Sequence, residues 1–184
     1  MLRQGAGRAH VLASCIRRPN LVAVRSKAYH VEGDGSGAAA MVKARSHTLR
    51  TDVPKSMGGK DSAPQPIELL LSALIGCETA TAAYVARHMQ PRLRLKRITF
   101  DYRAERDDKG SLELPIERRP SAESRLQVVH GRAEVHLMAG TEETPDRITR
   151  LYELVEQRCP IANMLRASGC RMDVQWSLAE PAPE

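Results

Sequence analysis

A long apolar stretch from Ile67 to His88 restricts the fold of this chain more than any other part of the sequence. Pro66 suits a first helical turn, and Glu68 is well placed for the positive end of a helix dipole. Apolar residues cover most of the circumference of such a helix, which must then be buried on most sides. At about 1.5 Å per residue the helix would span roughly 33 Å, the width of a small domain. We therefore expect a central helix around which the rest of the chain packs.

The same stretch is long enough to raise the question of a membrane span. Glu78 lies in its middle, where a charged residue costs about 2.5–3.5 kcal/mol on insertion scales. Ser72, Thr79 and Thr81 add further polar groups. We expect a core or dimer-core helix, and no stable membrane insertion.

The net charge of +6 is concentrated at the N-terminus. Residues 1–31 contain six basic side chains and no acid, which accounts for the whole excess of 28 Lys and Arg residues over 22 Asp and Glu residues. A nucleic-acid-binding domain carries its charge on a folded face, so we expect no nucleic-acid partner. A hydrophobic content of 42% and a charged content of 27% suffice for one soluble core and exclude collagen-like and largely disordered classes.

An Arg-rich, acid-free composition in residues 1–28 is typical of a mitochondrial presequence. A secretory signal would need a longer apolar run, which residues 17–19 interrupt. We expect a mitochondrial protein cleaved near residues 25–29; the alternative is a disordered basic tail on a cytoplasmic protein. Residues 29–180 then form the folded domain, followed by a tail at 181–184.

The periodicity of apolar residues predicts an α+β fold with strands that pair mainly antiparallel. Residues 105–125 are polar and contain Gly and Pro, so we expect an exposed excursion with a short strand at Leu112–Ile116. The other expected elements are strands at Tyr29–Glu32 and Met41–Arg50, joined by a turn at Gly33–Gly37, strands at Leu95–Ala104, Gln127–Met138 and Met172–Leu178, and helices at Thr144–Arg158 and Ile161–Ala167.

The chain contains four widely spaced cysteines: Cys15, Cys77, Cys159 and Cys170. There is no CxxC pair, which argues against a zinc site. There is no secretory signal, which argues against a disulfide framework. Isolated cysteines in an intracellular chain are either small buried residues or redox thiols, and we assign Cys170 no role beyond packing.

Two of these cysteines could carry chemistry. Cys159 precedes Pro160, a residue favoured at the first helical position, so Cys159 falls at or near a helix N-cap. The helix dipole and Arg158 would lower the pKa of its thiol there; the alternative is a packed cap residue. Cys77 follows Gly76 in the middle of the long helix, where the dipole helps little, and packing is the simpler interpretation of it.

Other catalytic signatures are missing from the sequence. It contains no nucleophile elbow, phosphate-binding loop or dinucleotide fingerprint, and no His pair on a predicted helix. Aromatic residues make up 3% of the chain, which leaves few platforms for stacked bases.

Two segments resemble motifs of the OsmC/Ohr family of osmotically inducible and organic-hydroperoxide-resistance proteins. The first runs GGKDSAPQPIELLLSALIGC and ends at Cys77; the second runs CPIANML and begins at Cys159. The similarity extends over about residues 28–178. It implies an OsmC-like fold, in which antiparallel sheets wrap around central helices in an intertwined homodimer with active sites at the dimer interface.

The resemblance also implies an activity, a thiol-dependent peroxidase acting on organic, lipid-type hydroperoxides. Cys77 would be the peroxidatic cysteine that becomes a sulfenic acid, and Cys159 the resolving cysteine that forms an intramolecular disulfide with it. An external dithiol such as dihydrolipoamide would reduce the disulfide, without a metal or organic cofactor. The alternative is a non-catalytic OsmC-like dimer that binds an apolar ligand or acts as an assembly component.

In the best-characterised branch of this family, an Arg–Glu pair activates the first cysteine. The position of that glutamate corresponds to Ile67, and the acid stands one residue later, at Glu68. The arginine has no counterpart in Gly33–Gly37, so we expect Arg45 or Arg50 to substitute for it. We expect Glu68 to take part in the network that activates Cys77.

Overall fold

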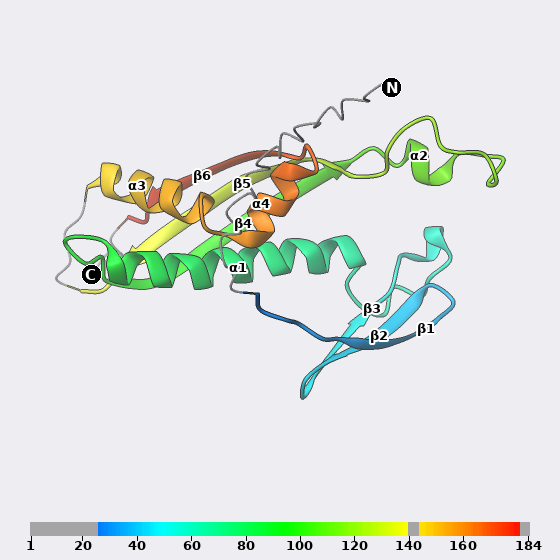
Figure 1. The fold of residues 1–184 in the computed structure, drawn as a ribbon, viewed down its shortest axis with the longest axis horizontal. Coiled ribbons are helices and arrows are strands. Elements are labelled where there is room, and N and C mark those ends of the chain that lie inside the picture. Colours follow the sequence, from blue (N-terminus) through cyan, green and yellow to red (C-terminus); the bar gives the residue numbers. More distant parts are fainter. Residues whose placement is uncertain (1–25, 140–143, 181–184) are drawn as a thin grey trace, which may run out of the picture.

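The computed structural model describes residues 26–139 and 144–180. The predicted presequence therefore lies outside the described residues except for 26–28, and the predicted tail at 181–184 lies outside them altogether. The described part is an α+β fold, as expected, with two three-stranded sheets and a long helix between them (Figure 1). Its main elements are β1 (Glu32–Ser36), β2 (Ala39–Ala44), β3 (His47–Thr51), α1 (Pro66–His88), β4 (Leu95–Arg106), α2 (Lys109–Leu112), β5 (Leu126–Leu137), α3 (Pro145–Glu156), α4 (Pro160–Ala167) and β6 (Arg171–Leu178).

Helix α1 forms where the central helix was expected, but in the single chain it is buried on one face and not on most sides. Its first turn is closed by a capping box, in which the Glu68 carboxylate accepts a hydrogen bond of 2.7 Å from the backbone N–H of Gln65. One face packs against β4, α3 and α4. The helix is long and apolar enough to cross a membrane by length and composition, a property that core helices share. The residues buried on its packed face are Leu74, Glu78, Ala82, Val85 and Ala86.

The core lies between the β4–β5–β6 sheet and the three helices that cover one of its faces (Figure 1). β4 and β5 pair antiparallel, whereas β5 and β6 pair parallel. A parallel pair needs a crossover connection, and α3 with α4 supplies it. The crossover brings Cys159, at the start of α4, against α1.

The small β1–β2–β3 sheet corrects two predictions. The segment expected as a turn, Gly33–Gly37, forms most of β1, and the turn itself follows at Gly37, where φ is +61°. The segment Met41–Arg50 is not one strand, because the chain reverses at Arg45, where φ is +58°. The strand expected at Met41–Arg50 was therefore assigned across a tight turn, and the strand expected at Tyr29–Glu32 shares only Glu32 with β1.

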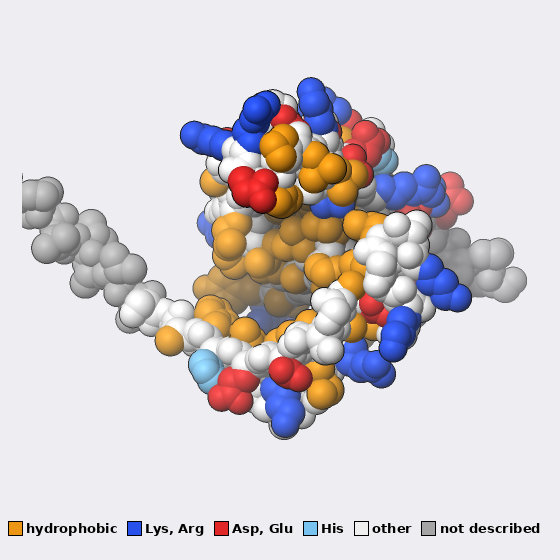
Figure 2. All heavy atoms as spheres, turned by 90° about the vertical axis from the view of Figure 1, so that its right-hand side faces the viewer, with side chains coloured by type: hydrophobic (Ala, Val, Ile, Leu, Met, Phe, Trp, Pro, Cys, Tyr) orange, Lys and Arg blue, Asp and Glu red, His pale blue; other side chains and the backbone are white. Residues whose placement is uncertain are grey.

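No residue of β1, β2 or β3 belongs to the buried core of the described chain. The sheet stands apart from the β4–β5–β6 sheet (Figure 1), and the face between the two is hollowed and lined with hydrophobic side chains (Figure 2).

The excursion after β4 is exposed, as expected, but the strand predicted at Leu112–Ile116 is wrong. Residues up to Leu112 form α2, and Pro115 follows a cis peptide bond. The excursion folds on itself, since the backbone N–H of Ser121 donates to the Glu113 carboxylate at 2.8 Å. A Cβ at Gly110 would collide with the carbonyl of Ala122.

Asp52 organises the loop that leads into α1. Its buried carboxylate accepts backbone hydrogen bonds from Val53, Lys60 and Ser62, and a fourth from the Ser62 hydroxyl. These bonds to the charged form, above all those from Ser62, lower the pKa of Asp52 to about 2. Gly59 is needed here, because a Cβ would meet the carbonyl of Val53.

Candidate functional site

Cys77 and Cys159 meet where α1 packs against α4. The Cys77 side chain is partly exposed, and that of Cys159 is fully buried. The thiol of Cys77 lies close enough to that of Cys159 to raise the pKa of Cys159. The fold thus brings together the two cysteines that the sequence singled out.

Cys159 is the N-cap of α4, as expected from Pro160. Its Sγ accepts a hydrogen bond of 3.5 Å from the backbone N–H of Ala162. This bond favours the thiolate, but burial outweighs it and raises the pKa of the Cys159 thiol to about 12. The lowering expected from the helix dipole is therefore wrong in sign, because the thiol is buried away from water.

Glu78 follows Cys77 on α1 and is also fully buried. Its Oε2 accepts a hydrogen bond of 2.7 Å from the Tyr102 hydroxyl, and its Oε1 has no hydrogen-bond partner among the described residues. Burial raises the pKa of Glu78 to about 7, against the lowering effects of Tyr102 and of the Arg166 charge. The carboxyl can thus exchange its proton near neutral pH.

Tyr102 is held in place by Trp176, whose indole N–H donates to the Tyr102 hydroxyl oxygen at 3.2 Å. Phe100 packs edge-on against both rings. Burial and the Glu78 carboxyl raise the pKa of Tyr102, so its hydroxyl stays a hydrogen-bond donor. Four of the few aromatic side chains, including Tyr152, therefore form one cluster that reaches Glu78 through Tyr102.

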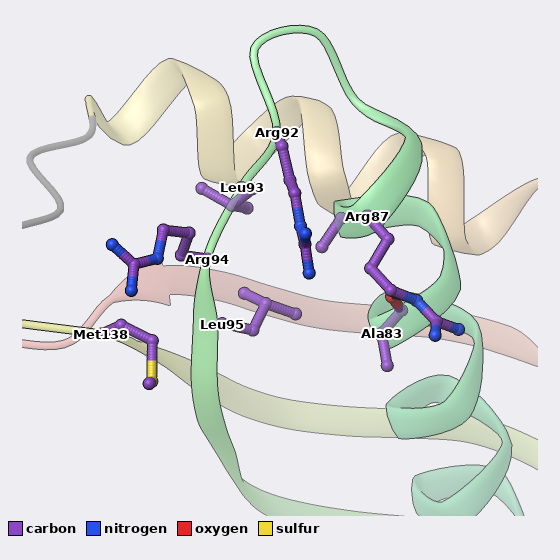
Figure 3. A pocket seen from close by; sticks show the side chains of 8 residues that line it. Ala83, Arg87, Arg92, Leu93, Arg94, Leu95 and Met138 are labelled. Atoms are coloured by element: carbon purple, nitrogen blue, oxygen red, sulfur yellow. Dashed lines mark hydrogen bonds between the residues drawn. The ribbon is translucent and has the colours of Figure 1, made fainter.

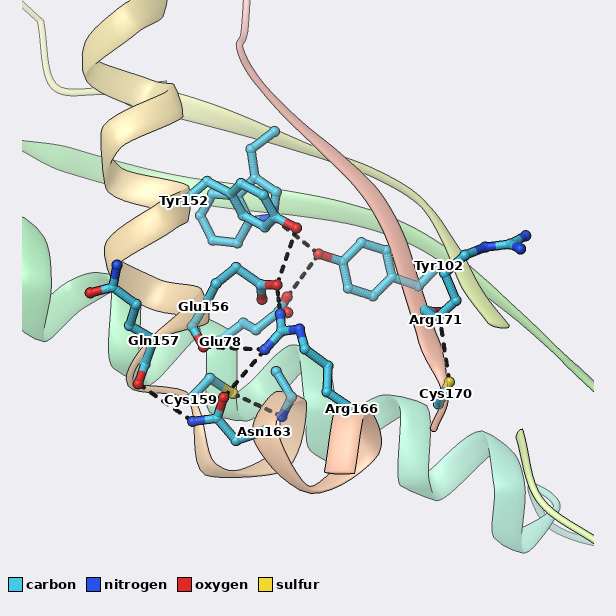
Figure 4. Close-up of polar contacts among 12 residues, drawn as sticks. Glu78, Tyr102, Tyr152, Glu156, Gln157, Cys159, Asn163, Arg166, Cys170 and Arg171 are labelled. Atoms are coloured by element: carbon cyan, nitrogen blue, oxygen red, sulfur yellow. Dashed lines mark hydrogen bonds and ion pairs between the residues drawn. The ribbon is translucent and has the colours of Figure 1, made fainter. Parts of the chain in front are cut away.

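A partly buried ion pair completes the cluster (Figure 4). The Arg166 guanidinium contacts the Glu156 carboxylate, and the Tyr152 hydroxyl donates to the same carboxylate at 3.2 Å. Arg166 also donates to the side-chain oxygen of Asn163 at 3.3 Å. A positive charge from α4 is thereby fixed close to Glu78.

The three other predicted site residues are not assembled around Cys77. The carboxylate of Glu68 caps the first turn of α1. Arg45 lies in the turn between β2 and β3, not on a second strand, and Arg50 lies on β3. Both arginines are exposed, and within the described chain neither guanidinium forms a hydrogen bond or ion pair. Their catalytic roles stay predictions.

One pocket lies away from the thiols. It has a volume of about 570 Å³ and opens between the end of α1 and the start of β4 (Figure 3). Arg87, Arg92 and Arg94 line it together with apolar residues, and neither cysteine does. Among residues 26–139 and 144–180 no cluster of His, Cys, Asp or Glu could hold a metal ion.

Sequence reasoning missed the residues that surround Glu78. Tyr102 lies on β4 and Trp176 on β6. The alternation of apolar and polar residues along these strands predicts which face is buried, but not which residues of other elements that face contacts. The contact between Tyr152 and Glu156 could have been predicted, since residues four apart on a helix lie on the same face. A buried acid in an apolar helix also requires polar partners.

Comparison with known proteins decides the family. The model of the family described as "OsmC-like protein" matches residues 59–175, which include both cysteines and all but the first residue of the two motifs. The chain belongs to the OsmC-like family. The resemblance of the two cysteine motifs is thereby confirmed, and the two thiols of this OsmC-like protein lie at the positions that the motifs indicated. No curated protein matches the chain.

Solved structures share the fold. The OsmC-like protein from Mycoplasma pneumoniae is 20% identical, with a TM-score of 0.63 over 84% of this chain and 99% of its own. A Legionella pneumophila organic hydroperoxide resistance protein is 16% identical, with a TM-score of 0.60 over 82% and 97%. A Vibrio cholerae protein described as a putative organic hydroperoxide resistance protein, with captopril in one active site, is 22% identical, with a TM-score of 0.58 over 86% and 97%.

Proposed function

We propose that this OsmC-like protein is a thiol-dependent peroxidase that reduces organic hydroperoxides. The observation that carries the proposal is the contact between Cys77 and Cys159, which lie on different helices and far apart in the sequence. The names of two similar structures, which call them organic hydroperoxide resistance proteins, point to the same class of substrate.

The exposures of the two thiols match the order of the steps. Partly exposed Cys77 is open to a substrate, and its thiolate attacks the distal oxygen of the hydroperoxide, giving a sulfenic acid and an alkoxide that takes a proton to become an alcohol. Buried Cys159 then displaces hydroxide from the sulfenic sulfur, giving a disulfide and water. A dithiol such as dihydrolipoamide restores both thiols by two exchange steps.

A homodimer belongs to the proposal, because three surfaces of the single chain are left open. The β1–β2–β3 sheet has no buried residue, and a hollow lined with hydrophobic side chains lies beside it (Figure 2). On α1 the exposed face carries Ala73, Gly76, Ala80 and Ala83, small residues that allow close approach of another helix. A second copy would cover these surfaces and bring further charges, such as those of Arg45 and Arg50, to the sites.

The proposal extends to the compartment. Residues 1–28 would direct the protein to mitochondria and be removed there, where dihydrolipoamide-type dithiols are a suitable reductant. Sequencing the N-terminus of the protein isolated from cells tests this. A mature chain that starts near residues 25–29 is expected, and one that still starts at Met1 would contradict it.

A peroxide assay with dihydrolipoamide tests the activity. Wild-type protein should turn over cumene hydroperoxide, Cys77→Ser should lose turnover, and Cys159→Ser should accumulate a sulfenic acid at Cys77 that a dimedone-type probe captures. Cys170→Ser serves as the matched control, since that thiol is buried beyond the C-terminal end of α4, just before β6, and should be dispensable. A wild-type protein inert to hydroperoxides would reject the proposal and leave the non-catalytic dimer that binds an apolar ligand.

A further inference from the structure

Glu78 is a buried carboxyl that the peroxidase steps above do not use. It is one of two buried acids among the described residues, and the other, Asp52, has all its partners in a loop. One oxygen of Glu78 is held by Tyr102, and the other has no partner in the described chain although it is buried. A buried polar atom without a partner needs an explanation, and one explanation is a proton that it takes up and releases.

The thiol of Cys159 lies within electrostatic reach of both Cys77 and Glu78. Cys77 and Glu78 are adjacent on α1, and both act on the ionisation of Cys159. Figure 4 places Glu78 and Cys159 in one cluster with Arg166. The titratable and charged groups around Glu78 are Cys77 on its own helix, Tyr102 from β4, Tyr152 and Glu156 from α3, Cys159 and Arg166 from α4, and Asp173 from β6, which acts through Tyr152.

We propose that Glu78 carries the proton of the resolving thiol, as the base that removes it from Cys159 and the acid that returns it to the departing oxygen. This inference rests on the proposed peroxidase function and adds a catalytic residue to it. The reaction balances without a further reactant. The Cys159 proton moves to the free oxygen of Glu78, the Cys159 sulfur attacks the sulfenic sulfur of Cys77, the S–O bond breaks, and hydroxide leaves as water with the proton from Glu78.

The surroundings of Glu78 suit this role. Tyr102 fixes one carboxyl oxygen and is itself fixed by Trp176, so the other oxygen is oriented and left free. Cys159 needs a base, because a thiol with a pKa of about 12 is almost entirely protonated at neutral pH. Glu78, with a pKa of about 7, can both accept and release a proton under the same conditions.

A single-turnover experiment separates the two chemical steps. Full-length protein is mixed with one equivalent of cumene hydroperoxide, and sulfenic acid and disulfide are followed by rapid quenching and intact mass. Glu78→Gln should form the Cys77 sulfenic acid at the wild-type rate but close the disulfide roughly 100-fold more slowly, the usual size of a lost acid–base group. The wild-type closing rate should rise with pH through about 7, and the variant should lose this inflection.

A peroxide-free arm distinguishes failure of this inference from failure of the proposed function. In chains with Cys15→Ser and Cys170→Ser, Cys77 is converted to its mixed disulfide with thionitrobenzoate, and Cys159 then releases the coloured thiol. Release should be slowed by Glu78→Gln and unaffected by Glu153→Gln, a matched change on the exposed face of α3. If no sulfenic acid forms with peroxide but release of thionitrobenzoate still depends on Glu78, the proposed peroxidase function is refuted, while the role of Glu78 as the base for Cys159 is supported.

Tyr102→Phe gives a second variant that does not depend on how Glu78→Gln folds. Removing the hydroxyl removes a hydrogen bond that lowers the pKa of Glu78, so the inflection in the closing rate should move to higher pH. A purely structural role of the cluster would change the rate without moving the inflection. Wild-type closing rates with a wild-type pH profile in Glu78→Gln, in both arms, would overturn the inference.

Discussion

The protonation of Glu78 should be visible in the stability of the protein. Its pKa of about 7 in the folded chain exceeds the ordinary value of 4.5, so the folded state keeps a proton that the unfolded chain releases. The resulting stabilisation is complete below pH 4.5 and is lost as the pH rises through 7, a change on the order of 3 kcal/mol. Glu78→Gln should remove this dependence and be more stable than wild type at pH 8. Urea unfolding of both proteins at pH 4.5 and 8 measures this dependence. An equal change in unfolding free energy between the two pH values in both proteins would contradict the assignment.

Asp52 should show the opposite dependence on pH. Its pKa of about 2 lies below the ordinary value of 3.8, so its stabilising effect is present above pH 3.8 and is lost as the pH falls to 2. Asp52→Asn should lower the urea midpoint at pH 7, and the difference from wild type should shrink toward pH 2. Asp101→Asn, on an exposed carboxylate, is the control. A constant difference at all pH values would mean that lost packing, not the ionised carboxylate, explains the effect.

At the level of residues, the sequence predicted the thiols better than their chemistry. Cys77 and Cys159 stand out because each lies in a distinctive motif, and Pro160 correctly placed Cys159 at an N-cap. The direction of the Cys159 pKa was wrong, since it depends on burial by other elements. Tyr102, the hydrogen-bond partner of Glu78, comes from β4 and is itself bound by Trp176 of β6, and local residue spacing does not predict contacts between such distant segments.

Among the elements, the β4–β5 pair depends on one glycine next to the site. Gly131 lies opposite Tyr102 with φ at +147°, and a Cβ there would collide with the carbonyl of Asp101. Gly131→Val should therefore cost at least about 2 kcal/mol of unfolding free energy and shift Tyr102 away from Glu78. Thermal unfolding measures the loss. Gly35→Ala is the control, because a Cβ at Gly35 meets only an ordinary contact, and an equal loss in both variants would refute the explanation.

The long helix and the later strands could be predicted because their periodicity extends over many residues. α1 begins one residue before the predicted start, and β4 and β5 lie within two residues of theirs. The first strands could not be predicted, because glycines that usually mark a turn pair with β2 here. Their backbone conformation is set by the neighbouring strand, which local sequence does not reveal.

At the scale of the whole molecule, the open surfaces of the single chain predict a dimer. Gly76→Lys should disrupt it, because a side chain at Gly76 meets nothing within 4 Å in the single chain but would clash with a helix packed against that face. Sedimentation equilibrium should give a dimer for wild type and a shift toward monomer for the variant. Thr149→Lys, on the exposed face of α3, should stay dimeric. A monomeric wild-type protein would contradict the proposed assembly.

The central claim, that Cys77 and Cys159 form a redox pair, is tested most directly by mapping the disulfide after peroxide treatment. One equivalent of cumene hydroperoxide should convert reduced wild-type protein to a form lighter by two hydrogens, and peptide mass analysis should find Cys77 joined to Cys159. Dihydrolipoamide should reverse the change. Protein that keeps both thiols free, or that joins either one to Cys170 instead, would contradict the account.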